Sequence, residues 1–468
     1  MATLIRHGRL VTASDDIPAD LRLEGGRVVA IAPSLPPGPG DEVHDATGLL
    51  VLPGAVDVHT HLEMVTPRMA TIDTFESGTR AAAFGGTTTV IDYCTPARGQ
   101  GLLAALADWH RLAERSCIDV AAHMCLLDAD SATLQQMPAL VRDEGVSSFK
   151  LFMAYPGSLM VDDGALLHAL RTAAGLDALT CVHAENGPAI QALIEDALAD
   201  GRLAPKFHAA TRPAELEGEA VHRAICLAGL AGAPLYVVHL STAQALAAVR
   251  EARGRGQLVM AETCPQYLFL TDREYARPGF EGAKFVMSPP LREAGHPETL
   301  WGGLADGSLQ AVATDHCSFC YEVPAQGMRY SKQQGVADFT RIPNGAPGLE
   351  TRLALMHEGA VVRHGFSLQR WVEITATAPA RLFGLYPRKG TLAVGSDADV
   401  VLFDPAERWT VRAAEHHSLA DYSIFEGQQL TGRVKKVFSR GRCIVDGEQW
   451  QGRAGQGQFV KRGPSGHA

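Results

Sequence analysis

AVDVHTH at residues 55–61 is the first of eight short segments, rich in β-branched and apolar residues, that end with LQAVATDH at residues 309–316. The six segments between them are TTTVIDY (87–93), DVAAHMCL (119–126), SSFKLFMA (147–154), ALTCVHAE (178–185), PLYVVHLS (234–241) and LVMAETCP (258–265). Amphipathic runs rich in Ala and Leu separate them, which is the pattern of repeated strand–helix units. Eight parallel strands with outer helices predict the α/β class and a (β/α)8 TIM barrel.

The two ends of the chain show a different pattern. Short alternating segments joined by Gly- or Asp-containing turns occupy residues 3–32 and 395–446, as in β-hairpins. We expect both ends to build one small β-sandwich domain together. The predicted division is 1–52 for its N-terminal part, 53–385 for the barrel, 386–450 for its C-terminal part and 451–468 for a flexible, glycine-rich tail.

The composition narrows the classes of partner. The formal net charge of −10 offers no basic surface to nucleic acid. The first residues lack a basic region followed by a sustained apolar stretch, and no later run is long enough to predict a membrane helix. Nine scattered cysteines suit reduced thiols, and the CxxC formed by Cys317 and Cys320 is assigned a structural role. The expected protein is soluble and cytoplasmic.

Histidine, lysine and carboxylate residues gather at the predicted C-terminal ends of the strands, the face that holds the active site in TIM barrels. His59 and His61 lie two apart on the first strand, so both imidazoles can reach one cation. A single HxH pair is a weak signal, because histidines also occur as satisfied core residues. The further candidates at other strands are Lys150, His183, His239 and Asp315. Their convergence on one face predicts a metal site.

Lys150 alternates into the predicted barrel interior, where divalent ions would repel a charged ammonium. Burial and nearby cations would lower the pKa of its amine, and a neutral amine can react with carbon dioxide to give a carbamate, N6-carboxylysine. The two carbamate oxygens could join two metal ions. The predicted ligands of one ion are His59, His61 and Asp315, and those of the other are His183 and His239. Zinc is the expected metal, with manganese, cobalt or nickel as substitutes.

Nine stretches, in order along the chain, resemble the bacterial hydantoinases and dihydropyrimidinases. They are PGAVDVHTHLEM, GTRAAAFGGTTTVIDY, SSFKLFMAYPG, CVHAENG, VVHLST, ETCPQYL, FVMSPPLR, ATDH and RIPNGAPGLETR, within a resemblance that runs from about residue 1 to residue 450. It implies a cyclic amidohydrolase that opens hydantoins or dihydropyrimidines to N-carbamoyl amino acids. It also implies two metal ions, a carboxylated Lys150 and dimers assembled into a homotetramer. Three substrate contacts are implied, namely Tyr155, Ser288 and Asn344, the last two largely through their main chain.

The predicted residues suggest how such a ring would be opened. A hydroxide bridging two divalent ions is available near neutral pH, because metal ions lower the pKa of bound water to about 7. We expect it to attack the carbonyl next to the imide nitrogen while the Tyr155 hydroxyl stabilises the oxyanion. Asp315 would accept a proton and pass it to the leaving nitrogen. His316 projects to the other side of its strand and is expected to support its neighbours or to pack.

Apolar residues follow the predicted site on neighbouring loops. Met64, Val65, Phe152 and Leu159 are predicted to form a hydrophobic wall beside the substituent on the ring carbon. Such a wall favours aliphatic or aromatic substituents over carboxylates, and the resemblance implies that this pair of loops sets D-selectivity. The alternative is that Leu159 only packs its loop onto the barrel.

Other protein classes share parts of this pattern. Dihydroorotases bind a substrate carboxylate with an arginine just after the HxH, whereas Leu62 and Glu63 follow it here. Allantoinases are a closer alternative, and metal-dependent deaminases lack the lysine on the fourth strand. Collapsin-response-mediator proteins share the fold as non-catalytic scaffolds without a metal site, whereas all six candidate ligands are present here. The choice between hydantoin and dihydropyrimidine rings stays open.

Overall fold

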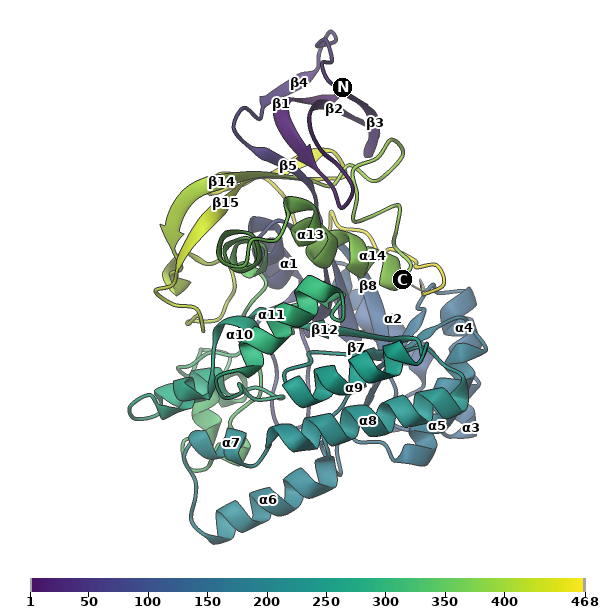
Figure 1. Cartoon of the computed structure of the whole chain (residues 1–468), viewed down its shortest axis with the longest axis vertical. Coiled ribbons are helices and arrows are strands. Elements are labelled where there is room, and N and C mark those ends of the chain that lie inside the picture. The colour runs from purple at the N-terminus through teal and green to yellow at the C-terminus, as the bar shows by residue number, and fades with distance from the viewer. Residues whose placement is uncertain (1, 466–468) are drawn as a thin grey trace.

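The computed structural model describes residues 2–465, and its centre is an eight-stranded parallel barrel (Figure 1). In sheet order, which is also chain order, the strands are β6 (Ala55–Thr60), β7 (Thr87–Cys94), β8 (Asp119–Cys125), β9 (Ser148–Phe152), β10 (Leu179–His183), β11 (Leu235–Val237), β12 (Val259–Thr263) and β13 (Ala311–Val312). The His61 N–H donates to the carbonyl oxygen of His316 at 2.9 Å, and Thr60 pairs with His316, so the first and last strand segments meet. The predicted TIM barrel is confirmed.

Helices cover the outside of the barrel (Figure 1). They are α1 (Phe75–Phe84), α2 (Leu102–Ala113), α3 (Ser131–Leu134), α4 (Met137–Arg142), α5 (Asp163–Ala174), α6 (Gly187–Ala199), α7 (Lys206–Ala210), α8 (Ala214–Ala231), α9 (Ala243–Gly254), α10 (Pro265–Phe269), α11 (His296–Asp306), α12 (Arg352–Met356), α13 (Leu368–Val372) and α14 (Ala378–Leu382). The side chains of Thr74, Asp162 and Thr242 accept hydrogen bonds from first-turn N–H groups of α1, α5 and α9. Thr and Asp are favoured as N-caps because their side-chain oxygens satisfy N–H groups that the helix itself leaves unpaired.

Shorter helical turns connect the regular elements. The 3-10 turns are η1 (Asp272–Ala276), η2 (Glu281–Phe285), η3 (Met328–Tyr330), η4 (Lys332–Gly335), η5 (Phe339–Arg341) and η8 (Ala413–Glu415), and the π-helical turns are η6 (His357–Arg363) and η7 (Glu373–Thr377). Two of the expected substrate contacts follow such turns, since Ser288 comes three residues after η2 and Asn344 three residues after η5.

The two chain ends share a second, nine-stranded sheet (Figure 1). Its strands are β1 (Thr3–Val11), β2 (Asp16–Glu24), β3 (Arg27–Ala32), β4 (Glu42–Asp45), β5 (Leu50–Pro53), β14 (Val400–Thr410), β15 (Gln429–Ser439), β16 (Arg442–Asp446) and β17 (Gln449–Trp450). β5 pairs antiparallel with β14, with Leu52 opposite Val401. Ile5, Leu21 and Leu402 belong to one buried cluster between its strands. The predicted β-sandwich built from both ends is confirmed.

A buried ion cluster joins this domain to the base of the barrel. The Lys389 ammonium bonds to Asp119 at the start of β8, and it lies 2.9 Å from Asp397 and 2.6 Å from Asp399. Burial alone would lower the pKa of Lys389, but the three carboxylates raise it above its ordinary value. The lysine therefore occupies the space between acidic groups that otherwise have the spacing of a cation site.

Residues 451–465 differ from the sequence-based expectation of a flexible tail. Phe459 pairs with Val120 of β8, and Val460 is only 1 % exposed. A Cβ atom on Gly457 would lie 1.9 Å from the carbonyl oxygen of Ile118, so glycine here permits close packing of two backbones. The predicted flexibility is wrong for residues 451–465, and residues 466–468 lie outside the described part of the chain.

Within residues 2–465, none of the helices combines the length and the apolar character needed to span a bilayer.

Candidate active site

The side chains predicted as metal ligands meet at the C-terminal mouth of the barrel. They are His59 and His61 at the end of β6, Lys150 in β9, His183 in β10, His239 after β11 and Asp315 after β13. His59 Nε2 lies 3.1 Å, and His61 Nε2 3.3 Å, from the same Oδ1 atom of Asp315. His183 Nδ1 lies 2.9 Å from His239 Nε2. The rings of His59 and His239 are 5.4 Å apart between centroids, so the two groups of ligand candidates adjoin.

Two of these residues have an unusual backbone conformation. His239 has a φ of 38° and Asp315 a φ of 53°, in the left-handed region that non-glycine residues rarely occupy. Such conformations cost about 1–3 kcal/mol and occur mainly at functional sites, where the surrounding structure imposes them. β11 and β13 are shorter than the predicted strands, and both end before these residues.

The donor set fits a divalent metal ion. The ligand atoms of His59, His61 and Asp315 all lie within 4.8 Å of one another. Burial lowers the pKa of His61 to about 4 and that of His239 well below its ordinary value, so both imidazoles are neutral, as ligation requires. Burial alone would raise the pKa of Asp315, but His59 and His61 hold it well below the ordinary carboxyl value. Burial alone would lower the pKa of His59, but Asp315 and Glu262 raise it. Imidazole and carboxylate donors together suit borderline metals such as zinc.

Lys150 lies inside the barrel and is 1 % exposed. The strand register places Cys125 of β8 and Cys181 of β10 beside it, and its Nζ lies 4.7 Å from the centre of the Tyr93 ring. Burial lowers the pKa of the Lys150 amine. This apolar and thiol-lined setting favours the neutral amine that carboxylation requires.

Two buried glutamates that the sequence analysis did not single out orient the histidines. Glu262 Oε1 lies 2.5 Å from His59 Nδ1, and Glu185 Oε2 lies 2.8 Å from His183 Nε2. Glu262 Oε2 also accepts a hydrogen bond from the Tyr236 hydroxyl at 2.9 Å. Carboxylates of this kind select the histidine tautomer and the ring orientation at metal sites. A signal was available, because both glutamates lie at strand ends and Glu185 stands two residues after His183.

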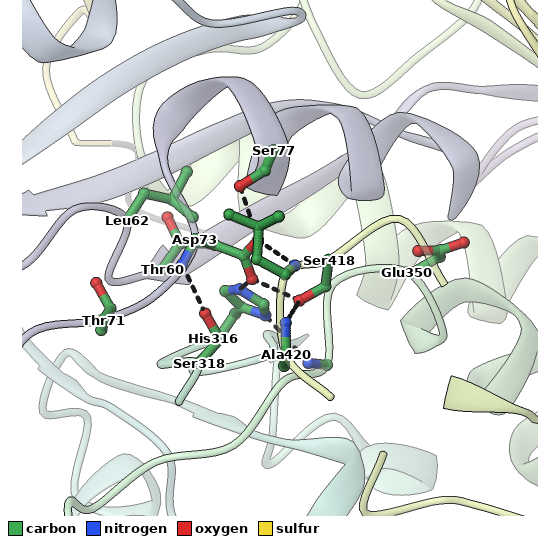
Figure 2. Close-up of polar contacts among 12 residues, drawn as sticks. Thr60, Leu62, Thr71, Asp73, Ser77, His316, Ser318, Glu350, Ser418 and Ala420 are labelled. Carbon is green, nitrogen blue, oxygen red and sulfur yellow. Dashed lines mark hydrogen bonds and ion pairs between the residues drawn. The ribbon is translucent and has the colours of Figure 1, made fainter. Parts of the chain in front are cut away.

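A polar cluster centred on Asp73 anchors the residue next to Asp315 (Figure 2). The partners of the Asp73 carboxylate are the hydroxyls of Ser77 and Ser418 at 2.8 and 2.5 Å, the Leu419 N–H at 2.8 Å and Nε2 of His316 at 3.1 Å. Burial alone would raise the pKa of Asp73. The hydrogen bonds lower this pKa to about 2, and the bond to His316 has the largest effect among them. The His316 side chain thus binds this cluster while Asp315 contacts His59, which agrees with the supporting role expected for His316.

The three implied substrate contacts lie on loops that meet beside the histidines. The Asn344 amide donates to the Ser288 hydroxyl at 3.2 Å. The Tyr155 ring lies 5.1 Å from the His183 ring between centroids, on a loop where Tyr155 itself has a φ of 68°. Burial raises the pKa of Tyr155 above its ordinary value, so the phenol keeps its proton and can donate it in a hydrogen bond.

Part of the predicted apolar wall is assembled. Phe152 belongs to a buried cluster with Tyr93, and Leu159 packs against that cluster. Met64 and Val65 lie on the loop after β6, where Val65 is 65 % exposed. The contribution of that loop to the wall stays a prediction.

Leu62 and Glu63 follow the HxH pair, where dihydroorotases are expected to have an arginine. Both side chains contact helix α1. The Leu62 side chain occupies the space beside Gly78, and the Phe75 N–H donates to the Glu63 carboxylate at 3.0 Å. The charge of Glu63 is therefore used at the start of α1. Only the missing arginine, and not the charge of Glu63, therefore bears on whether the substrate carries a carboxylate.

Comparison with known proteins shows the family of the chain. The amidohydrolase family matches residues 50–444. The chain is 49% identical to a D-hydantoinase of Streptomyces coelicolor over 465 residues, which cover 98% of both chains. It is 46% identical to a D-hydantoinase of Geobacillus stearothermophilus across 99% of this chain and 97% of the relative. The solved structure of dihydropyrimidinase from Brevibacillus agri matches with a TM-score of 0.96 at 47% identity, over 99% of each chain. The chain therefore belongs to the amidohydrolase family, in the group of hydantoinases and dihydropyrimidinases.

Proposed function

We propose that this protein hydrolyses the cyclic amide bond of hydantoins, dihydropyrimidines or both, and releases N-carbamoyl amino acids. The observation that carries the proposal is the meeting of two features at one barrel mouth. One is the histidine, lysine and aspartate donor set, and the other is the polar group of Tyr155, Ser288 and Asn344. The names of the relatives, D-hydantoinase and dihydropyrimidinase, support this substrate class.

Two divalent ions, zinc first, fit the proposed enzyme, with Lys150 as N6-carboxylysine. The residues to hold them are His59, His61, Lys150, His183, His239 and Asp315. When bound, such ions lower the pKa of water and polarise the scissile carbonyl. The buried orienting carboxylates of Glu185 and Glu262 support this assignment, because metal-binding histidines usually donate their second N–H to such a group.

The protein side chains supply proton transfer and orientation. The Asp315 carboxylate, ionised at neutral pH, takes the proton of the attacking water and delivers it to the leaving ring nitrogen. The Tyr155 hydroxyl donates to the oxygen that becomes negative in the transition state. The main chain of Ser288 and Asn344 binds the polar edge of the ring, which holds the scissile carbonyl in a productive orientation.

The oligomeric state is inferred from the resemblance, and the cellular compartment from the cysteines. The resemblance alone suggests a homotetramer or a homodimer. All nine cysteines are free thiols, which suits a reducing compartment such as the cytoplasm.

Turnover of three rings tests the proposed function. The metal-loaded protein is incubated with hydantoin, dihydrouracil and 5-phenylhydantoin, and the N-carbamoyl products are quantified by chromatography. We expect ring opening of at least one substrate, with 5-phenylhydantoin turned over well, and loss of turnover after chelation. Absence of turnover on all three rings would contradict the proposal; with metal bound it would favour an allantoinase, and without bound metal a non-catalytic scaffold.

The substitution Leu159→Phe tests the apolar wall. A larger ring at this position leaves less room for the substituent, so kcat/KM for 5-phenylhydantoin should fall relative to hydantoin by about 1–3 kcal/mol of transition-state binding. The matched control is Leu198→Phe on α6, where the leucine is exposed, and it should change neither substrate. An equal effect of Leu159→Phe on both rings removes Leu159 from the pocket and leaves it as a packing residue.

A further inference from the structure

Lys332, the first residue of η4, is fully buried and has an unusual set of partners. Its ammonium donates hydrogen bonds to the main-chain carbonyl oxygens of Val286 at 2.8 Å, Pro343 at 2.6 Å and Gly345 at 2.6 Å. Among residues 2–465, no carboxylate forms an ion pair with it. Burial lowers the pKa of Lys332 to about 7. Three carbonyl acceptors match the three N–H bonds of the protonated amine and compensate for part of that burial.

The three carbonyl groups belong to the two loops that carry Ser288 and Asn344. Val286 lies two residues before Ser288, and Pro343 and Gly345 stand on either side of Asn344. The loops also contact each other directly, since the Gly345 N–H donates to the same Val286 oxygen at 3.0 Å. A single ammonium therefore ties together the two substrate-side loops at the points next to their functional residues.

Two main-chain N–H groups of these loops are available to a ligand. Within the described chain, no hydrogen bond uses the N–H group of Ser288 or that of Asn344. Both groups are strong donors, and unsatisfied donors near a site are available to the ring oxygens of a cyclic imide. The direction of these N–H groups depends on the backbone conformation of each loop. Lys332 holds that conformation by binding the neighbouring carbonyl groups.

Main-chain hydrogen bonds fix the position of the Lys332 backbone. The Lys332 N–H donates to the Cys320 carbonyl at 2.8 Å, and the Cys320 N–H donates to the Tyr330 carbonyl at 2.8 Å. The ammonium lies 5.5 Å from the centre of the Phe319 ring. Phe319 and Cys320 belong to the segment that follows Asp315 in the sequence. Lys332 therefore connects the substrate-side loops to the segment that carries the catalytic carboxylate.

We propose that Lys332 is a positioning residue that sets the geometry of the main-chain ring-binding groups of Ser288 and Asn344. The proposal rests on the proposed function. Lys332 does not touch the substrate, and its effect comes through the two loops. Because the loops bind the polar edge that all these rings share, its loss weakens the binding of every ring alike.

The test is Lys332→Met, which keeps an unbranched side chain as far as Cε and removes the ammonium group with its three donors. We expect KM for hydantoin and for 5-phenylhydantoin to rise equally, by about 10- to 100-fold, the scale of a misplaced substrate. The value of kcat should fall by less than KM rises, because the lost hydrogen bonds weaken the binding of the ring and of the transition state alike, and only the misorientation of the scissile carbonyl appears in kcat. Metal content per subunit should equal that of the parent. Lys332→Gln, which retains an amide donor, should give a smaller rise in KM.

The matched control is Lys389→Met, which removes the other buried lysine with three oxygen partners, at the base of the barrel. It should lower Tm and leave KM at the parent value. Parent KM in a folded Lys332→Met enzyme overturns the proposal, as does a failure of both Lys332 variants to fold while Lys389→Met folds. Failure of the proposed function is a different result, because the parent itself would then open none of the rings.

Discussion

Replacement of Lys150 by alanine is expected to remove bound metal and to lower turnover by roughly 10⁴-fold or more, the scale for groups that activate a nucleophile. The reason is geometric, since Lys150 is the one predicted ligand able to join the His59 and His61 group to the His183 and His239 group. Metal per subunit, measured by atomic spectrometry, and kcat with hydantoin check this expectation. The control is Lys206→Ala on the surface of α7, which should match the parent.

A second measurement separates carboxylation from a purely structural role of Lys150. A short carboxylic acid such as acetate, supplied to Lys150→Ala, can replace the missing anion and should restore part of the metal content and of the rate. Carbon-13 NMR of the parent grown with labelled bicarbonate should show a carbamate signal that Lys150→Ala lacks. Two tightly bound metals with normal turnover in Lys150→Ala would refute the assignment.

The substitution Asp315→Asn is expected to slow ring opening by about 10²-fold or more, because an amide cannot accept the proton that the leaving nitrogen requires. Most metal should be retained, since the four histidines and Lys150 remain. Single-turnover kinetics with hydantoin, together with metal analysis, measure the two effects separately. Asp315 contacts both His59 and His61, so a small loss of affinity for metal is expected as well.

Asp196→Asn on the exposed side of α6 makes the same chemical change away from the site and should leave the rate unaltered. An unchanged rate in Asp315→Asn would assign Asp315 to ligation only. A loss of all metal in Asp315→Asn would show that its contribution to binding exceeds that of a single carboxylate among several ligands.

The barrel and the sandwich could be predicted because their patterns are local. Strands buried on both faces are continuous apolar runs, as LYVV at 235–238 illustrates, and the helix starts at Thr74 and Asp162 are marked by capping residues. The predicted strand at 309–316 is shorter in the structure, and a left-handed turn follows it at Asp315. That turn has no signal in a single sequence, because aspartate tolerates both conformations.

The glycine-rich tail shows where composition misleads. Glycine permits flexibility, and it also permits two backbones to approach more closely than any side chain allows. Only the position of Ile118 next to Gly457 decides between the two. The same limit applies to Glu63, whose charge alone did not reveal that it binds the start of α1.

The sequence by itself determined the set of metal-binding candidates, because residues at equivalent ends of parallel strands must share one face of the barrel. The tertiary structure alone decided which groups support them. Glu262 reaches His59 from a strand that lies 203 residues away in the chain, and Lys332 reaches loops that lie 46 and 11 residues away. These contacts form only because the barrel closes and the long loops fold back over it. Packing sets the distances between such groups, and the local periodicity of a sequence carries no information about them.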